Sequence, residues 1–311
     1  MTMAWDDRAA LAAARARSVA TARAWRDGVA YRDLAARFDA VDARDIEAVA
    51  AVAQHWLATP GAAVALLAPL IDALAGDDWF EPPFRVSRDP LRVGAILFDH
   101  PAVSIGASVL SARALAALPV PTSVSVSGRL TLVRYVRAGG ARLRLWTADR
   151  AGPDFSRADA APLAPLGTVS LTDDMILRID GRTRAARIED AADDVVTITA
   201  TIRAATDPFQ RDYALPSGAL TRIATNDDGA ARTQMLLTFL RHAGRADAGD
   251  CFAAATRDDA FFLRWAAMRE WLALDALAAL PRLRAMLDDP HAEVRAAAAQ
   301  TLPVVEAACH F

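Results

Sequence analysis

Residues 167–202, GTVSLTDDMILRIDGRTRAARIEDAADDVVTITATI, predict an antiparallel β-sheet in the middle of the chain. Within Val195–Ile202, apolar side chains alternate with threonines, which is the period-two pattern of a strand with one buried face. Asp180-Gly181 separates Met175–Ile179 from Arg182–Ile188. Because Asp-Gly between β-rich runs favours a type I′ turn with φ above zero, we predict a hairpin with Gly181 in the left-handed region.

Outward from this stretch, residues 90–205 predict seven or eight short strands with tight turns and no crossover helices. A second hairpin is predicted at Ala138-Gly139-Gly140, between Val124–Val136 and Ala141–Trp146. Short strands in this number are typical of an antiparallel sandwich or barrel.

The order of these strands resembles the cupin, or jelly-roll, class, with residues 167–181 in the place of a late cupin hairpin. The resemblance implies a barrel that encloses a pocket. Metal-binding cupins carry a His-x-His pair and a downstream Glu and His on their strands, and the sequence shows none of these. We therefore expect no bound metal and no cofactor.

The chain is helical on both sides of the strands. From Asp6 to Gly76, apolar residues recur at helical spacing and predict three or four helices. Periodicity typical of helices returns after Pro216-Ser217-Gly218. We expect an α+β protein with a helical segment at 1–80, a β-sandwich or barrel at 90–205 and a helical domain at 220–311.

The stretch LAALPRLRAMLDDPHAEVRAAAAQTL, residues 277–302, resembles a HEAT repeat. Proline in the first helix, Asp-Pro at the turn and Val-Arg at the start of the second helix carry the resemblance. An Asp-Asp pair followed by arginine recurs every 30 to 32 residues, which suggests weaker copies within residues 226–308. HEAT-like arrays present surfaces to other macromolecules, so the resemblance implies a protein or peptide partner.

Composition excludes several classes. A net charge of −3 and a pI near 6.0 argue against a general nucleic-acid binder, because phosphate contacts need concentrated positive charge. The two cysteines are far apart, so we expect no disulfide framework. The first residues are acidic where a secretory signal is basic, and the longest apolar stretch is shorter than the roughly 20 residues that span a bilayer. We therefore expect a soluble, cytoplasmic protein without a membrane segment.

Charge is segregated along the chain. Residues 129–187 contain eleven arginines and six aspartates, a net of +5, while the remainder carries −8. Arg134 and Arg178 each interrupt an apolar run, and aromatic neighbours could supply a flat wall for an anionic small molecule. The candidate ligand-binding residues are Arg134, Arg178, Tyr135, Arg144 and Trp146. The alternative is that these arginines lie on strand surfaces and pair with acids.

Other candidates are weaker. Asp99 and His100 could perform acid–base chemistry if a turn brought them together. Cys251 has no base beside it in the sequence and is expected to be a small buried residue. In residues 261–271 an aromatic helix face is expected to pack in the protein or to form a partner groove. We expect a metal-independent ligand- or peptide-binding protein; the alternative is an enzyme acting in the barrel on an anionic molecule.

Overall fold

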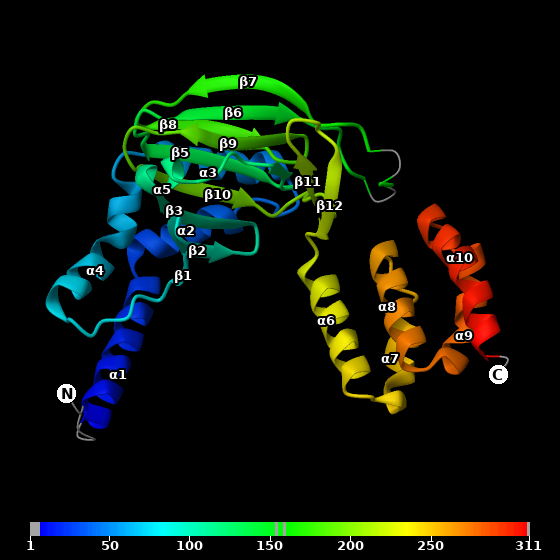
Figure 1. Ribbon diagram of the computed structural model, residues 1–311. Helices are drawn as coiled ribbons and strands as arrows, with labels where there is room; N and C mark the ends of the chain where they lie inside the picture. Colours follow the sequence, from blue (N-terminus) through cyan, green and yellow to red (C-terminus); the bar gives the residue numbers. More distant parts are fainter. Residues whose placement is uncertain (1–6, 153–154, 158–159, 310–311) are drawn as a thin grey trace. The chain divides into compact units, whose positions relative to one another are not determined.

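The computed structural model describes residues 7–152, 155–157 and 160–309, and it has the expected α+β composition with helices at both ends (Figure 1). The chain divides into two compact units. The first comprises Met1–Asp149, Pro162–Thr206 and Asp212–Ala219, and the second comprises Arg150–Ala161, Asp207–Arg211 and Leu220–Phe311. The predicted division at 1–80, 90–205 and 220–311 remains a prediction about which segments fold independently.

Four helices begin the first unit: α1 (Asp7–Arg26), α2 (Val29–Asp39), α3 (Ile46–Ala58) and α4 (Ala62–Gly76). Asp45 caps α3, because its carboxylate accepts hydrogen bonds from the backbone N–H groups of Glu47 and Ala48. The indole N–H of Trp25 donates to the carbonyl of Leu66 at 2.6 Å, which joins α1 to α4. These contacts hold the four helices as one layer.

Two antiparallel sheets follow. The larger has the order β1-β2-β3-β10-β5-β8, with bounds Arg85–Arg88, Arg92–His100, Val103–Leu110, Val195–Ile202, Leu130–Arg137 and Met175–Asp180. The smaller has the order β7-β6-β9, with bounds Ala164–Ser170, Arg142–Thr147 and Arg184–Asp190. A short helix, α5 (Ala112–Ala116), and strand β4 (Ser123–Val126) lie between β3 and β5 in the chain.

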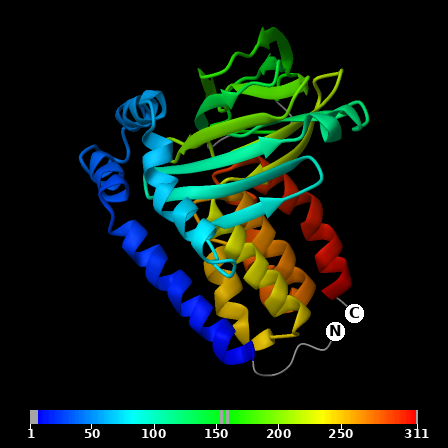
Figure 2. The same cartoon turned by 90° about the vertical axis from the view of Figure 1, so that its left-hand side faces the viewer.

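The larger sheet lies between the helices and the smaller sheet (Figure 2). Strand β10 shows how one strand serves both cores. Ile198, Ala200 and Ile202 are buried against the helices, whereas Val195 is buried in the core shared with the smaller sheet. A bulge in the pairing with β5 between Val196 and Thr197 permits this change of face.

The two predicted hairpins are wrong. Asp180-Gly181 joins β8 to β9, and Ala138-Gly139-Gly140 joins β5 to β6, but in each case the two strands belong to different sheets. Gly139 and Gly140 do have φ of 61° and 66°, whereas Gly181 is not among the described residues with positive φ. A Cβ at Gly181 would lie 2.5 Å from the Arg129 carbonyl oxygen. Close backbone approach, and not the left-handed region, therefore requires glycine here.

Replacing Gly181 by alanine is expected to lower the free energy of unfolding by about 1–3 kcal/mol, because the added Cβ overpacks a close backbone contact. Asparagine should cost at least as much, although it is tolerated better than alanine at left-handed positions. Gly76→Ala is the control, since a Cβ there meets nothing within 4 Å. Urea denaturation measures the difference. An asparagine variant clearly more stable than the alanine variant would restore the left-handed turn.

The second unit is mainly helical. Its helices are α6 (Asp228–His242), α7 (Gly249–Ala255), α8 (Phe261–Leu274), α9 (Ala276–Ala285) and α10 (Ala292–Cys309). Strand β12 (Leu220–Thr225) precedes them, and β11 (Phe209–Ala214) begins in this unit and ends in the first. Helix α8 packs against α6, α7, α9 and α10, and the shared core includes Phe252, Met268 and Leu283.

The recurring Asp-Asp and arginine pattern has a structural basis in two of its copies. One guanidinium nitrogen of Arg264 donates to the carbonyls of Asp258 and Asp259 at 2.9 and 3.0 Å. Arg295 donates in the same way to Asp289 and Pro290 at 2.7 and 2.9 Å. Each arginine thus closes the turn before its own helix. Membership of the HEAT class remains a prediction.

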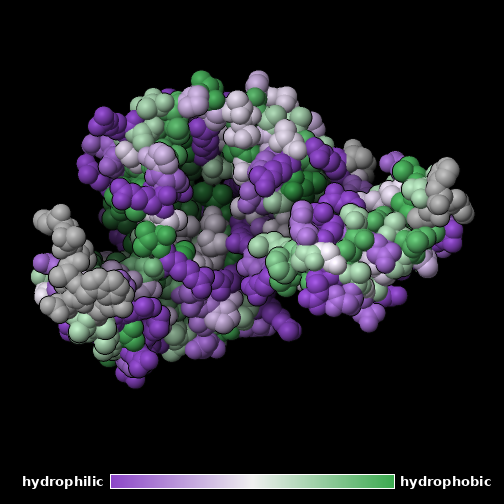
Figure 3. Space-filling model, turned by 60° about the horizontal axis from the view of Figure 1, so that its bottom comes forward, coloured by the Kyte–Doolittle hydropathy of each residue, from purple (hydrophilic) through white to green (hydrophobic). Residues whose placement is uncertain are grey.

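Among the described residues, no single helix is long and apolar enough to cross a membrane, although the bent pair α3 and α4 meets the length and composition criteria jointly. Figure 3 shows hydrophobic and hydrophilic residues intermixed over the face that it draws. Exposed apolar side chains on the second unit include Met235, Leu236 and Phe239 of α6.

Candidate functional site

The second unit contains a pocket of about 720 Å³. Its lining comes from β12, from the N-terminal halves of α6, α8 and α10, and from two segments that precede β12 in the chain. All of the lining residues belong to this one unit. A volume of this size lies within the range of pockets that bind small molecules.

Aromatic side chains form most of the pocket wall: Phe155, Phe209, Phe261, Phe262 and Trp265. The ring of Phe209 lies 5.2 Å from that of Phe262 and 5.8 Å from that of Phe261, both in edge-to-face geometry. Behind the wall, Phe261 stacks on the imidazole of His291. Such contacts fix the rings in place and leave flat apolar faces for a ligand.

The sequence of α8 explains why these rings are available. Leu263, Ala267 and Met268 are buried in the helical core, so residues on the other side of α8 turn away from that core. Phe262, Trp265 and Arg269 lie on that side at spacings of three and four residues, and all three line the pocket. The aromatic helix face predicted from the sequence therefore divides between core packing and a pocket.

Two arginines add positive charge to the lining. Arg222 on β12 and Arg269 on α8 are exposed, and neither side chain forms a hydrogen bond or ion pair with a residue in the described ranges. Glu293 also lines the pocket, but its Oε1 accepts hydrogen bonds from the Ser156 hydroxyl at 2.8 Å and the Arg157 N–H at 2.9 Å. The two guanidinium groups are therefore available to a ligand.

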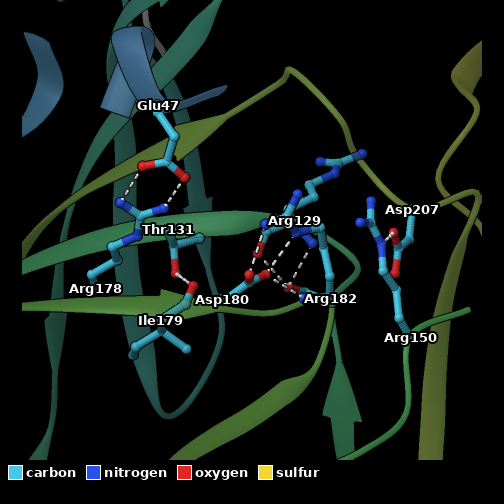
Figure 4. A network of polar contacts seen from close by, with 10 residues as sticks. Glu47, Arg129, Thr131, Arg150, Arg178, Ile179, Asp180, Arg182 and Asp207 are labelled. Atoms are coloured by element: carbon cyan, nitrogen blue, oxygen red, sulfur yellow. Dashed lines mark hydrogen bonds and ion pairs between the residues drawn. The ribbon is translucent and has the colours of Figure 1, made fainter. Parts of the chain in front are cut away.

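Arg134 and Arg178 lie on the helix-covered face of the larger sheet, where acids already occupy them. Arg134 donates to Asp174 at 2.6 and 3.0 Å and to the Leu57 carbonyl at 2.8 Å. Figure 4 shows Arg178 forking onto both oxygens of Glu47, at 2.5 and 2.7 Å. The hydrogen bonds from Arg178 hold the pKa of Glu47 below its usual value. The alternative that these arginines pair with acids fits this arrangement.

The other three candidates lie elsewhere. Tyr135 is buried in the core between the two sheets, and burial raises the pKa of its hydroxyl to about 12. Arg144 pairs with Glu189 at 2.9 Å, and its guanidinium carbon lies 5.5 Å from the ring centre of Trp146. The structure therefore brings Arg144 to Trp146 and does not gather the five residues into one barrel pocket.

Asp99 and His100 do not act on each other. The Nε2 atom of His100 lies 3.0 Å from Asp39 at the end of α2, and its Nδ1 accepts from the Ala102 N–H at 3.2 Å. Asp99 pairs instead with Arg203. Adjacent residues on β2 point to opposite faces of the sheet, which separates the two side chains.

Two further expectations concern metal and cysteine. No group of three or more His, Cys, Asp or Glu residues that could hold a metal ion occurs in the described part of the chain. Cys251 is free and exposed, so its prediction as a buried residue is wrong. Residues 249–255 form a short helix in which Phe252 supplies the buried side chain, and Cys251 points away from the core.

Sequence reasoning missed Phe155, Phe209 and Arg222. They come from segments separated from α8 by up to about a hundred residues, and no local spacing connects them. The available signal was the run Phe261-Phe262 at the start of an amphipathic helix, followed by Trp265. That run predicted a packed face or a groove, and the structure gives it both roles.

No known family model matches the sequence, and no curated protein matches it significantly. Solved structures that resemble the chain include a cupin domain from Bordetella pertussis Tohama I, with 14% identity, coverage of 38% of this chain and 99% of that chain, and a TM-score of 0.24. A cupin 2 conserved barrel domain protein from Rhodopseudomonas palustris has 11% identity, coverage of 50% and 86%, and a TM-score of 0.26.

CapF with the inhibitor 3-isopropenyl-tropolone has 13% identity and a TM-score of 0.25, and the match covers 40% of this chain and 31% of CapF. The structural neighbours are thus cupin-domain proteins, the class that the order of strands resembles. At these TM-scores the likeness carries no information about a ligand or an activity, which we infer from the geometry of the chain.

Proposed function

We propose that this chain is a ligand-binding protein whose second unit binds a small amphipathic anion in the aromatic pocket. The observation that supports this most is the combination of a pocket of about 720 Å³ with two arginines, Arg222 and Arg269, that have no partner among the described residues. In this proposal the anion site belongs to the helical unit and not to the β-sheets.

The chemistry of the wall and of the rim supports different parts of one ligand. Flat apolar rings such as those of Phe209, Phe262 and Trp265 favour an aromatic or other planar apolar body, through burial and edge-to-face contact. Guanidinium groups favour a carboxylate, sulfonate or phosphate, onto which they donate paired hydrogen bonds. A ligand with both features uses both surfaces at once.

Binding is favoured over catalysis by the pocket itself. Glu293 is the acid among the described lining residues, and its Oε1 is engaged by Ser156 and Arg157. No histidine or cysteine stands among the described lining residues to act beside it. A protein or peptide partner on the helical surface, and metal independence, remain further parts of this proposal.

A matched pair of fluorescent probes tests the proposal. 8-Anilinonaphthalene-1-sulfonate has a planar apolar body and one negative charge, and N-phenyl-1-naphthylamine has the same body without the charge. We expect the sulfonate to bind the native chain saturably at one site. In the double variant Arg222→Gln with Arg269→Gln its affinity should fall at least tenfold, about 1.4 kcal/mol, while the neutral probe should be unaffected.

Arg232→Gln is the control, because Arg232 is an exposed arginine of α6 that does not line the pocket. It should leave the affinity for the sulfonate unchanged. Absence of saturable binding, or equal weakening by the control and the double variant, would overturn the proposed function.

A further inference from the structure

A second, chemically different hollow lies on the larger sheet of the first unit. Its volume is about 450 Å³, and its lining comes from β1, β2, β3 and β10. Pairing places Ser87 opposite Gly94, Gly94 opposite Ser108, and Gly106 opposite Thr199. Directly opposed residues share one face of a sheet, so these five line the hollow from the same side.

That side is the one opposite the helices. Ile105 and Ala107 alternate with Gly106 along β3 and contribute to the core beneath the helices. Since neighbouring residues on a strand point to opposite faces, Gly106 and Ser108 face away from α1–α4. The hollow is therefore separate from the helix-covered core.

Two glycines give the hollow its depth. Gly94 and Gly106 lie within β2 and β3, and neither has a positive φ that would require glycine. A Cβ at Gly106 would lie 3.1 Å from the Ala95 carbonyl oxygen, and one at Gly94 would lie 3.4 Å from its nearest neighbours. Glycine within a strand weakens the strand, and it often marks a place where a ligand approaches the backbone closely.

The groups around the hollow suit an oxyanion. Ser87, Ser108 and Thr199 bring hydroxyls, and Ser108 is already oriented by a 2.9 Å hydrogen bond with Thr197. Arg85 and Arg92 line the hollow, and neither guanidinium pairs with a described residue. No carboxylate occurs among the described lining residues, so the local charge is positive.

We infer that this hollow binds the phosphate group of a small polar ligand. Two guanidinium groups donate to the phosphate oxygens, and the hydroxyls supply the shorter hydrogen bonds that a neutral wall could not. The site has no aromatic wall, so its ligand differs from the one proposed for the second unit. The inference does not depend on the proposed function of the aromatic pocket.

Inorganic phosphate is the probe, at constant ionic strength against chloride. In ¹H–¹⁵N spectra of the full chain, the amide signals of Gly94 and Gly106 should shift saturably as phosphate is added. In the double variant Arg85→Gln with Arg92→Gln, the apparent affinity should fall at least tenfold. Arg88→Gln is the matched control, because Arg88 is an exposed arginine of the same strand that does not line the hollow.

The control should bind phosphate as the parent does. If Arg88→Gln weakens binding as much as the double variant, the arginines act only as a general positive edge and the site is refuted. Absence of a saturable shift in the parent refutes it as well. Arg222→Gln with Arg269→Gln should leave phosphate binding intact, so the two sites can fail separately.

Discussion

Replacing Val294 by aspartate is expected to lower the free energy of unfolding of the second unit by about 4 kcal/mol or more. Val294 is 1% exposed and lies in the core formed by α8, α9 and α10. An aspartate there loses the packing of the valine and buries a carboxylate with no described cation to receive it. The Val294→Ala variant removes the packing alone and should cost less than the aspartate.

Chemical denaturation of the full chain, followed by tryptophan fluorescence, measures this effect. Ala292→Asp is the matched control, because Ala292 is exposed in the first turn of the same helix, where a negative charge is tolerated or mildly stabilising. A Val294→Asp variant that unfolds at the parent's denaturant concentration would contradict the helical core described above. Leu302 and Glu293, expected to be buried and exposed respectively, are both half-buried.

The second large effect concerns the buried ion pair between Arg264 and Asp289. The two side chains are 9% and 1% exposed, and Arg264 donates to both carboxylate oxygens at 2.6 and 2.8 Å. Asp289→Asn is expected to cost about 3–5 kcal/mol, because it leaves the guanidinium buried and uncompensated. Replacing both residues by leucine and methionine should cost less than the sum of the single changes.

This pair also predicts a pH dependence. Burial opposes ionisation of Asp289, but hydrogen bonds from Arg264 and from the His291 N–H outweigh it and hold its pKa below the ordinary value of 3.8. A carboxyl whose pKa is lowered by folding contributes stability above its unfolded pKa, and that stability is lost as pH falls through the folded pKa. Stability should therefore decline below about pH 4, and the decline should be shallower in Asp289→Asn.

Denaturation midpoints measured from pH 7 down to pH 3 test this dependence. Asp247→Asn is the control, because Asp247 pairs with Arg245 at an exposed position and should change the profile little. An Asp289→Asn profile parallel to the parent's would contradict the stabilising role of the ionised carboxylate.

Sequence pattern was sufficient where local spacing determines structure. The alternation in Val195–Ile202 predicted a strand, and β10 covers those residues with Ile198, Ala200 and Ile202 buried. Turn chemistry was less informative, because a turn does not specify which sheet its flanking strands join. Asp180-Gly181 has the composition of a hairpin turn, yet it carries the chain from one sheet to the other.

The site could not be predicted because its groups meet only through long-range packing. Arg178 looked available within its strand, but its partner Glu47 lies 131 residues away on α3. Conversely, Phe155 and Phe209 lie in unremarkable segments, and folding brings them together at a ring distance of 6.1 Å. Net charge by segment found the arginines, but it could not tell a paired guanidinium from an available one.

A crystal structure of the full chain soaked with a brominated naphthalenesulfonate would test the proposed anion pocket most directly, since the bromine can be located by anomalous scattering. The proposed pocket predicts one strong peak among Phe209, Phe262 and Trp265, with the sulfonate within hydrogen-bond distance of Arg222 or Arg269. A ligand bound elsewhere, or a sulfonate that contacts neither arginine, would contradict it.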